Sequence, residues 1–179
     1  CSSGWLTTVA NMKNGHCTCF NFPGLEATVE FADIFACVAP RVLVCELGEQ
    51  AREVTSCPLI IKLSPNVTDV ASFAMRAEEI GADAVSAINT LLGMKIDIKT
   101  MRPHFTNKVA GLSGPAVRPV AVRIVYQIFQ KVKIPIVGMG GISNLDDVLE
   151  FIMAGASAVS IGTASMVEPE VSGKLVRQL

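Results

Sequence analysis

The stretch LIIKLSPN, residues 59–66, ends an apolar strand pattern in a polar turn, and this pattern decides the fold. Three later stretches repeat it: AVSAINT at 84–90, IPIVGMGG at 134–141 and AVSIGTA at 158–164. Segments with helical periodicity lie between the strand patterns, and the unit recurs at a spacing of roughly thirty residues. This alternation predicts a parallel sheet in an α/β protein, with the strand ends gathered at one edge as in a β/α barrel.

The individual elements follow from the same periodicities and from the turn residues between them. Strands are expected over 59–62, 84–89, 134–138 and 158–162. Helices are expected over 42–54, from Thr68 or Asp69 to a left-handed stop at Gly81, over 116–132, from Ser143 to Gly155, and over 169–179. Ser143 followed by Asp146 resembles a capping box. Between Leu91 and Gly111, Lys95, Asp97 and Lys99 alternate with Met94, Ile96 and Ile98, which predicts a short exposed strand or ribbon inserted after a barrel strand.

The predicted fold class is therefore α/β, in the TIM (β/α)8 barrel family, with about the last four β/α units recognisable. A complete barrel typically needs about 250 residues, whereas the chain has 179. Residues 1–41 contain scattered glycine and proline, with candidate strands at 27–31 and 33–38. We divide the chain into an unassigned segment, 1–41, and the C-terminal half of a barrel, 42–179.

Composition excludes several classes of protein. Half of the residues are hydrophobic, 17% are charged and the net charge is −1, as suits strands buried on both faces. No stripe of Lys and Arg indicates a nucleic-acid partner. No apolar stretch reaches the roughly 18 residues of a membrane span, and the amino end lacks a signal-peptide pattern, so we expect a cytoplasmic protein. The six cysteines are interpreted as free thiols, and the sequon Asn66-Val67-Thr68 as coincidental.

Lys62 ends the first of these strands. Its aliphatic stem would be buried, and its ammonium group would point at the ligand in the barrel mouth. A fixed cation there can stabilise a phosphate, an enolate, a Schiff base or a reduced flavin. The alternative is a strand-end lysine that extends into solvent, as most lysines do.

Asn89 and Thr90 follow the second strand and offer hydrogen-bond donors and acceptors at the same mouth. An amide and a hydroxyl suit the recognition of a small polar ring. A turn stabilised by the Asn89 side chain is the alternative interpretation.

Glycine turns follow the last two strands, at Gly140-Gly141 and at Gly162-Thr163. Exposed backbone N–H groups before a helix can hold a phosphate, and barrel enzymes often form their phosphate site in these two loops. Ser113-Gly114 could bring the backbone close to a flat ligand. No histidine or cysteine spacing indicates a metal site.

Five strings carry a family resemblance: KLSPNVTD, INTLLGMKIDIKT, GLSGPAVRPVAVR, IPIVGMGGI and AGASAVSIGTA. In this order they resemble the FMN-dependent dihydroorotate dehydrogenases, in the cytosolic NAD-linked class with a separate electron-transfer subunit. The resemblance covers about residues 42–179. It implies oxidation of (S)-dihydroorotate to orotate in de novo pyrimidine biosynthesis, by removal of a ring proton and transfer of a hydride to FMN. NAD, FAD and an iron-sulfur cluster would be bound only by the partner subunit. The resemblance also implies either a homo-oligomer or a heterotetramer with that partner.

The resemblance also implies roles for individual residues. Lys62 would lie beside the flavin and stabilise negative charge on the reduced ring. Asn89 and Thr90 would hydrogen-bond dihydroorotate or orotate. The remaining FMN contacts would come from the backbone of Ile88 and Gly114 and, around the phosphate, from Gly140, Gly141, Gly162 and Thr163.

The catalytic base is where the sequence departs from the family. In the resembled class the base is a cysteine in a string like NISCPN, which the family spacing would place near Ala27. No such string occurs, and Cys37 lies too close to Lys62 in sequence and fits a buried thiol better. The catalytic residue therefore stays unknown.

Three other functions remain open. The flavin module of a dihydropyrimidine dehydrogenase shares part of the pattern, although GMKIDIKT and LSGPA favour dihydroorotate. A non-redox lyase or transferase could use the glycine turns for a substrate phosphate. An inactive fragment is the third alternative.

Overall fold

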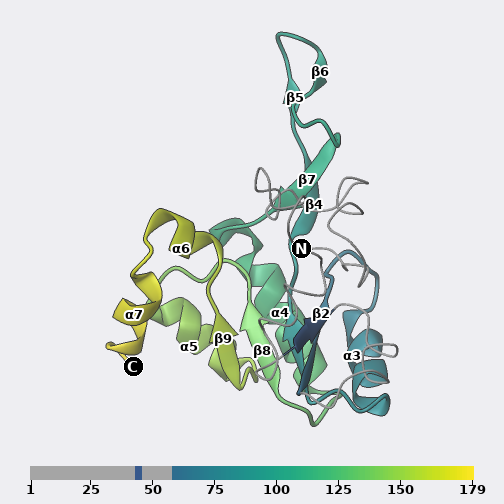
Figure 1. Cartoon of the computed structure of the whole chain (residues 1–179), viewed down its shortest axis with the longest axis vertical. Helices are drawn as coiled ribbons and strands as arrows, with labels where there is room; N and C mark the ends of the chain where they lie inside the picture. Colours follow the sequence, from purple (N-terminus) through teal and green to yellow (C-terminus); the bar gives the residue numbers. More distant parts are fainter. Residues whose placement is uncertain (1–42, 46–57) are drawn as a thin grey trace, which may run out of the picture.

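The computed structural model describes residues 43–45 and 58–179. Its centre is a five-stranded parallel sheet with strand order β1-β2-β3-β8-β9 (Figure 1). The strands are β1 Leu43–Cys45, β2 Leu59–Leu63, β3 Ala84–Ala87, β8 Ile136–Met139 and β9 Ala158–Ser160. The predicted α/β class with a parallel sheet is confirmed, and the four predicted strands are all present.

Three helices cover the sheet. Helix α3, Val70–Glu79, packs on β2 and β3; α4, Arg118–Phe129, packs on β3 and β8; and α5, Leu145–Met153, packs on β8 and β9. A 3-10 turn, η4 Pro115–Val117, precedes α4. Two short helices, α6 Thr163–Val167 and α7 Val171–Val176, complete the chain. None of the helices in the described ranges is both long and apolar enough to cross a membrane.

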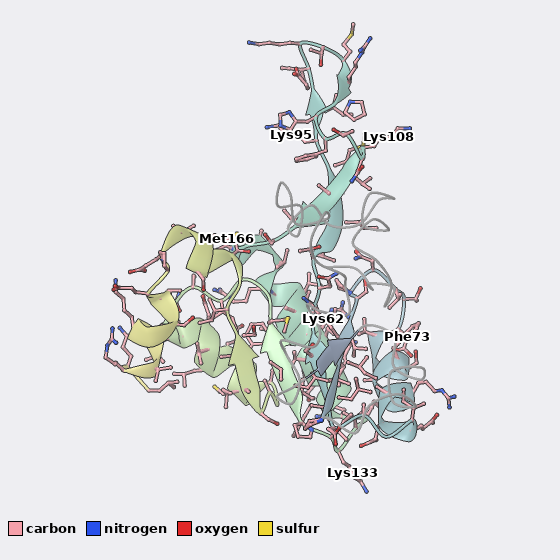
Figure 2. All side chains as sticks on the ribbon, in the orientation of Figure 1. Lys62, Phe73, Lys95, Lys108, Lys133 and Met166 are labelled. Atoms are coloured by element: carbon pink, nitrogen blue, oxygen red, sulfur yellow. The ribbon has the colours of Figure 1, made fainter. Side chains whose placement is uncertain are left out.

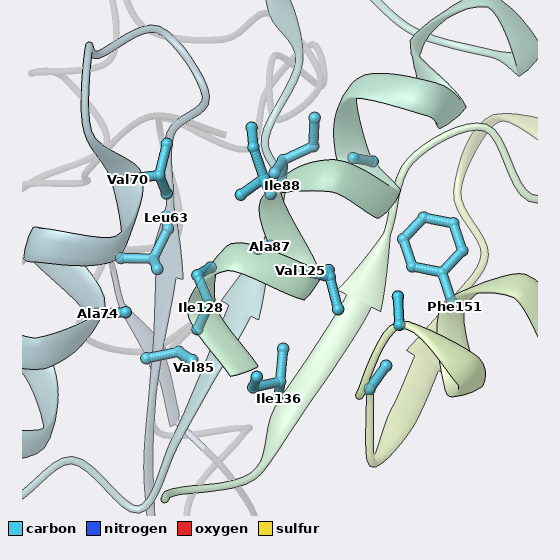
Figure 3. Close-up of a cluster of buried hydrophobic side chains, with 14 of the residues drawn as sticks. Leu63, Val70, Ala74, Val85, Ala87, Ile88, Val125, Ile128, Ile136 and Phe151 are labelled. Carbon is cyan, nitrogen blue, oxygen red and sulfur yellow. The ribbon is translucent and has the colours of Figure 1, made fainter. Parts of the chain in front are cut away.

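The core lies between the sheet and these helices, where aliphatic side chains interdigitate (Figure 3). Val85 and Ile136 from the strands and Ile128 from α4 are almost fully buried. Phe151 of α5 reaches β8 at Gly138, where an added Cβ would lie 2.5 Å from its ring. Burial of such side chains contributes about 1.5 to 3 kcal/mol each, and this packing fixes the strand ends that form the site.

Several helix ends agree with the sequence. Asp69 caps α3 by accepting hydrogen bonds from the N–H groups of Ala71 and Ser72. Gly81 and Gly155, after α3 and α5, have φ values of 81° and 108°, the left-handed conformation that favours glycine. Of the two predicted starting residues, Thr68 and Asp69, the structure has Asp69 as the cap, and the prediction of Gly81 as a stop is confirmed.

Two element predictions are wrong. Residues 43–45 lie inside the helix expected over 42–54 but form β1, paired in parallel with β2 from Leu43↔Leu59 to Cys45↔Ile61. A short apolar run fits either element, and pairing with a neighbouring strand decides between them. The capping box is formed by Asn144 and Asp147, one residue later than Ser143 and Asp146. Residues 1–42 and 46–57, and with them the candidate strands and the unassigned segment, lie outside the described residues.

The predicted ribbon is present and projects away from the sheet (Figure 1). It consists of two antiparallel pairs: β4 Leu91–Met94 with β7 Val109–Leu112, and β5 Ile96–Asp97 with β6 Arg102–Pro103. Lys95 and Lys108 lie along it, well away from Lys62 in the sheet (Figure 2). Its apolar side chains are exposed as well, with Ile98 at 87% and Met101 at 85%.

Candidate active site

A cavity of about 430 Å³ lies at the carboxyl ends of the parallel strands. Strand β2 contributes Lys62 from its second-last position. Strands β3, β8 and β9 contribute residues from their last position or from the turn that follows. All nine residues singled out in the sequence line it: Lys62, Ile88, Asn89, Thr90, Gly114, Gly140, Gly141, Gly162 and Thr163. The structure therefore brings together positions that are up to 101 residues apart in the chain.

Lys62 reaches the cavity because of the alternation along β2. Leu59, Ile61 and Leu63 are buried in the core, so Lys62 projects to the opposite face and is half-buried. Glu168 is the other charged residue of the cavity lining, and it forms an ion pair with Lys174. Within residues 58–179 no carboxylate lies at ion-pair distance from Lys62. A cation held in this way can stabilise negative charge on a bound molecule.

The end of β3 is held between its two neighbours. The N–H of Ile88 donates to Met139 O at 2.9 Å, and the N–H of Asn89 donates to Leu63 O at 3.0 Å. Ile88 is buried, whereas Asn89 is half-buried and Thr90 is exposed. The Asn89 and Thr90 side chains form no hydrogen bond within the described part of the chain, so their polar atoms are available to a ligand.

Asn66 links the residues that follow β3 to the base of the ribbon. Its Nδ2 donates to Thr90 O at 2.9 Å and to Ser64 Oγ at 3.2 Å, and its Oδ1 accepts from Leu92 N at 2.9 Å. The sequence pattern indicates no role for Asn66 in the site. Its partners Thr90 and Leu92 lie 24 and 26 residues away, and no local pattern reveals such contacts.

The turn after β8 depends on glycine. Gly140 and Gly141 have φ values of 130° and 79°, a region that side chains disfavour. A Cβ on Gly140 would lie 2.9 Å from Ala121 Cβ, and one on Gly141 would lie 2.7 Å from Gly114 O. Gly114 also has a positive φ, 91°. The β8–α5 and β7–α4 loops are therefore in direct backbone contact, and Gly114, Gly140 and Gly141 all line the cavity.

The turn after β9 is more open. Gly162 precedes α6, and a Cβ at this position would meet nothing within 4 Å. Thr163 is the first residue of α6. The N–H of Ser165 donates to Gly162 O at 3.0 Å, so the N–H groups of Thr163 and Ala164 are those left without a partner within the helix. This turn and the Gly140-Gly141 turn line the same cavity, as expected for two loops that share one anionic group.

Behind the glycine turn lies an ion pair that sequence reasoning missed. Asp147, in the first turn of α5, is 3% exposed and pairs with Arg118 from the start of α4. Its Oδ2 accepts hydrogen bonds of 2.8 Å from both N and Oγ of Ser143, and a longer one of 3.3 Å from Asn144 N. Arg118 Nε lies 3.1 Å from Glu150 Oε2 without alignment for a hydrogen bond. The pair joins the amino ends of the two helices that follow the cavity loops.

The electrostatics of Asp147 favour its ionised form. Burial acts to raise the pKa of Asp147, but the hydrogen bonds from Ser143 and Asn144, together with the charge of Arg118, outweigh it. The pKa therefore lies below its ordinary value of 3.8.

Comparisons with known proteins point in one direction. The family model described as dihydroorotate dehydrogenase matches residues 25–179. The chain is also similar to proteins named dihydroorotate dehydrogenase B (NAD(+)), catalytic subunit. The one from Geobacillus sp. (strain WCH70) is 49% identical over 137 residues, which are 76% of this chain and 44% of that protein. The one from Caldicellulosiruptor saccharolyticus is 54% identical over 127 residues, 71% of this chain and 42% of that protein.

A third relative of the same name, from Malacoplasma penetrans, is 52% identical over 133 residues, 74% of this chain and 44% of that protein. The chain thus spans less than half of the length of the curated relatives it matches.

Proposed function

The chain belongs to the dihydroorotate dehydrogenase family, and from that premise we propose that it forms the C-terminal half of an FMN-binding barrel that oxidises (S)-dihydroorotate to orotate in pyrimidine biosynthesis. One observation carries the proposal. The nine residues that the family resemblance assigns to flavin and substrate all line a single cavity at the strand ends.

The cavity suits FMN in both size and chemistry. Its volume of about 430 Å³ falls within the range of about 300–1,000 Å³ usual for small-ligand sites. The turn at Gly140 and Gly141 can be formed only by glycine, because of its positive φ values and its close packing on the neighbouring loop. Its main chain lines the cavity, and main-chain N–H groups before a helix can bind a phosphate. Gly140, Gly141, Gly162 and Thr163 would hold that phosphate. Bound FMN would supply an acceptor for the hydride that dihydroorotate loses.

Lys62 would act on the flavin ring. Its cation lies on the cavity wall and pairs with no carboxylate of residues 58–179. It would stabilise the negative charge that the reduced ring carries. Backbone contacts to the flavin would come from Gly114 and Ile88. The N–H of Ile88 already donates to Met139 O, so Ile88 would contact the flavin through its carbonyl oxygen.

Asn89 and Thr90 would bind the substrate ring. Both side chains line the cavity with polar atoms that lack partners among the described residues. An amide can both donate to and accept from an imide edge, which matches the ring of dihydroorotate. Their position beside Lys62 would place the substrate next to the flavin.

The rest of the enzyme belongs to the same proposal. The relatives' name, catalytic subunit, supports a separate electron-transfer partner, which would bring NAD, FAD and an iron-sulfur cluster. A closed barrel, a homo-oligomer or heterotetramer, and a cytoplasmic location remain predictions. The base that removes the substrate proton is not assigned.

Anaerobic titration of the full-length protein tests the proposal. Dihydroorotate should bleach the absorbance of bound FMN, and an equal concentration of dihydrouracil should not. Faster bleaching by dihydrouracil would instead identify a dihydropyrimidine dehydrogenase module. A folded protein that neither carries flavin nor binds added FMN would contradict the proposal and favour a non-redox phosphate-binding barrel.

A further inference from the structure

The ion pair between Arg118 and Asp147 joins the two loops that carry the cavity glycines. Arg118 begins α4, four residues after Gly114, and Asp147 lies in the first turn of α5, six residues after Gly141. The pair does not line the cavity, so it can act only through the backbone that it holds.

The contacts show which backbone is held. On one side, Asp147 accepts hydrogen bonds from Ser143 and Asn144, which end the turn that Gly140 and Gly141 begin. On the other side, a Cβ on Gly141 would lie 3.0 Å from both N and Cβ of Arg118. The glycine turn is thus fixed by the carboxylate at one end and packed against the arginine backbone at the other.

A capping box alone does not require this arrangement. Asn144 and Asp147 would complete the box without any contribution from α4. Here the same carboxylate also pairs with a cation from another helix, 29 residues earlier in the chain. Because the carboxylate is buried, separating it from Arg118 would leave a buried charge uncompensated. The pair therefore restrains the Asp147 side chain more than a solvent-exposed ion pair would.

We propose that Asp147, together with Arg118, is a positioning residue that holds the Gly140–Ser143 turn in the conformation that receives the phosphate group of FMN. The inference rests on the proposed function and adds to it a residue that contacts neither flavin nor substrate. We call the Arg118–Asp147 ion pair, with the hydrogen bonds from Ser143 and Asn144, the brace. Without it the Gly140–Ser143 turn would relax, and the backbone N–H groups of the turn would no longer converge on one anion.

Comparison of FMN with riboflavin in the full-length apoprotein tests this inference. Riboflavin has the same ring but no phosphate, so a brace that acts on the phosphate turn affects only FMN. In Asp147→Asn the dissociation constant for FMN should rise about tenfold, the effect of losing a charge-assisted hydrogen bond, while that for riboflavin stays within about twofold. Fluorescence quenching of each flavin measures both constants.

Asp146→Asn is the matched control. Asp146 lies in the same first turn of α5 and is exposed, so this variant removes an equal charge from the same helix end without touching the brace. Its ratio of FMN to riboflavin affinity should equal that of the unmodified protein. If the ratio falls equally in both variants, the effect belongs to the charge of the helix end and the inference is wrong.

A second variant decides the matter if Asp147→Asn fails to fold. Arg118→Met leaves the carboxylate and its hydrogen bonds from Ser143 and Asn144 in place but removes the link to α4. It should lower the affinity ratio as well, and Arg118→Lys should restore part of it. An unchanged ratio in Arg118→Met overturns the inference alone. Failure of the unmodified protein to bind FMN overturns the proposed function and the inference together.

Discussion

Gly141 lies directly against the backbone of Gly114, so close that a Cβ on Gly141 would stand 2.7 Å from the Gly114 carbonyl oxygen. Neither atom belongs to a flexible side chain, and the φ of Gly141 is 79°. We expect Gly141→Ala to lower the free energy of unfolding by about 2 to 4 kcal/mol, from the strained φ and the overpacked contact. Denaturant unfolding of the full-length protein measures this change.

Gly162→Ala is the comparison for Gly141→Ala. Nothing lies within 4 Å of a Cβ at Gly162, so the free energy of unfolding should change by less than about 1 kcal/mol. An equal loss of unfolding free energy in Gly141→Ala and Gly162→Ala would show that the loops of Gly141 and Gly114 do not meet as described.

Removal of the cation at Lys62 should change the flavin chemistry and leave the fold intact. Lys62→Met keeps most of the buried stem, and no ion pair within residues 58–179 is lost. The rate of flavin reduction by dihydroorotate should fall about a hundredfold or more, because a fixed charge no longer stabilises the reduced ring. The midpoint potential of bound FMN should become more negative. Stopped-flow absorbance and redox titration measure the two quantities, and an unchanged potential would argue against the role of Lys62.

Asn66→Ala should loosen the ribbon at its base. The variant removes the hydrogen bonds to Thr90 O and from Leu92 N, which should lower the free energy of unfolding by about 1 to 3 kcal/mol. Hydrogen exchange should accelerate at the Leu92 amide and leave the Val85 amide in the central sheet unchanged. Asn66→Asp retains an acceptor for Leu92 N and should give an intermediate exchange rate. Equal protection of Leu92 in all three proteins would contradict this account.

The stability contribution of Asp147 should depend on pH in one direction. Its pKa in the folded protein lies below the ordinary value of 3.8, so its contribution is fully present above that value. The contribution is lost as the pH falls through the lower folded pKa. At pH 7, Asp147→Asn should lower the free energy of unfolding by about 2 to 4 kcal/mol, because Arg118 loses its buried partner.

Unfolding of both proteins from pH 7 to pH 2 measures this dependence. The difference between them should shrink only below about pH 4. A difference that already disappears near pH 6 would show that Asp147 does not titrate as described.

The strand ends and their turns could be predicted from the sequence because their causes are local. Lys62 follows three apolar residues, and Gly140-Gly141 follows another apolar run. In a parallel sheet such ends share one edge, and this rule alone predicted that residues as distant as Lys62 and Thr163 line one cavity. The ribbon was also predictable, since charged and apolar residues alternate from Met94 to Lys99.

The features that could not be predicted depend on tertiary contacts. Residues 43–45 form a strand because β2 lies beside them, and periodicity carries no information about a neighbour. The capping box of Asn144 and Asp147 is a local motif one residue later than the predicted one, but the pair of Asp147 with Arg118 joins two different helices. No sequence window spans the 29 residues of that pair.

The two hydrogen bonds donated by the Asn66 side chain bear on the choice of expression host. Asn66-Val67-Thr68 is an acceptor sequence for N-linked sugars, and oligosaccharide transfer would replace one of the two Nδ2 hydrogens. Both hydrogens are engaged, one with Thr90 O and the other with Ser64 Oγ. A glycan attached to Asn66 in a secretory host would therefore disrupt the hydrogen bonds where the ribbon meets the cavity wall. Production in the bacterial cytoplasm, where this transfer does not occur, preserves the joint.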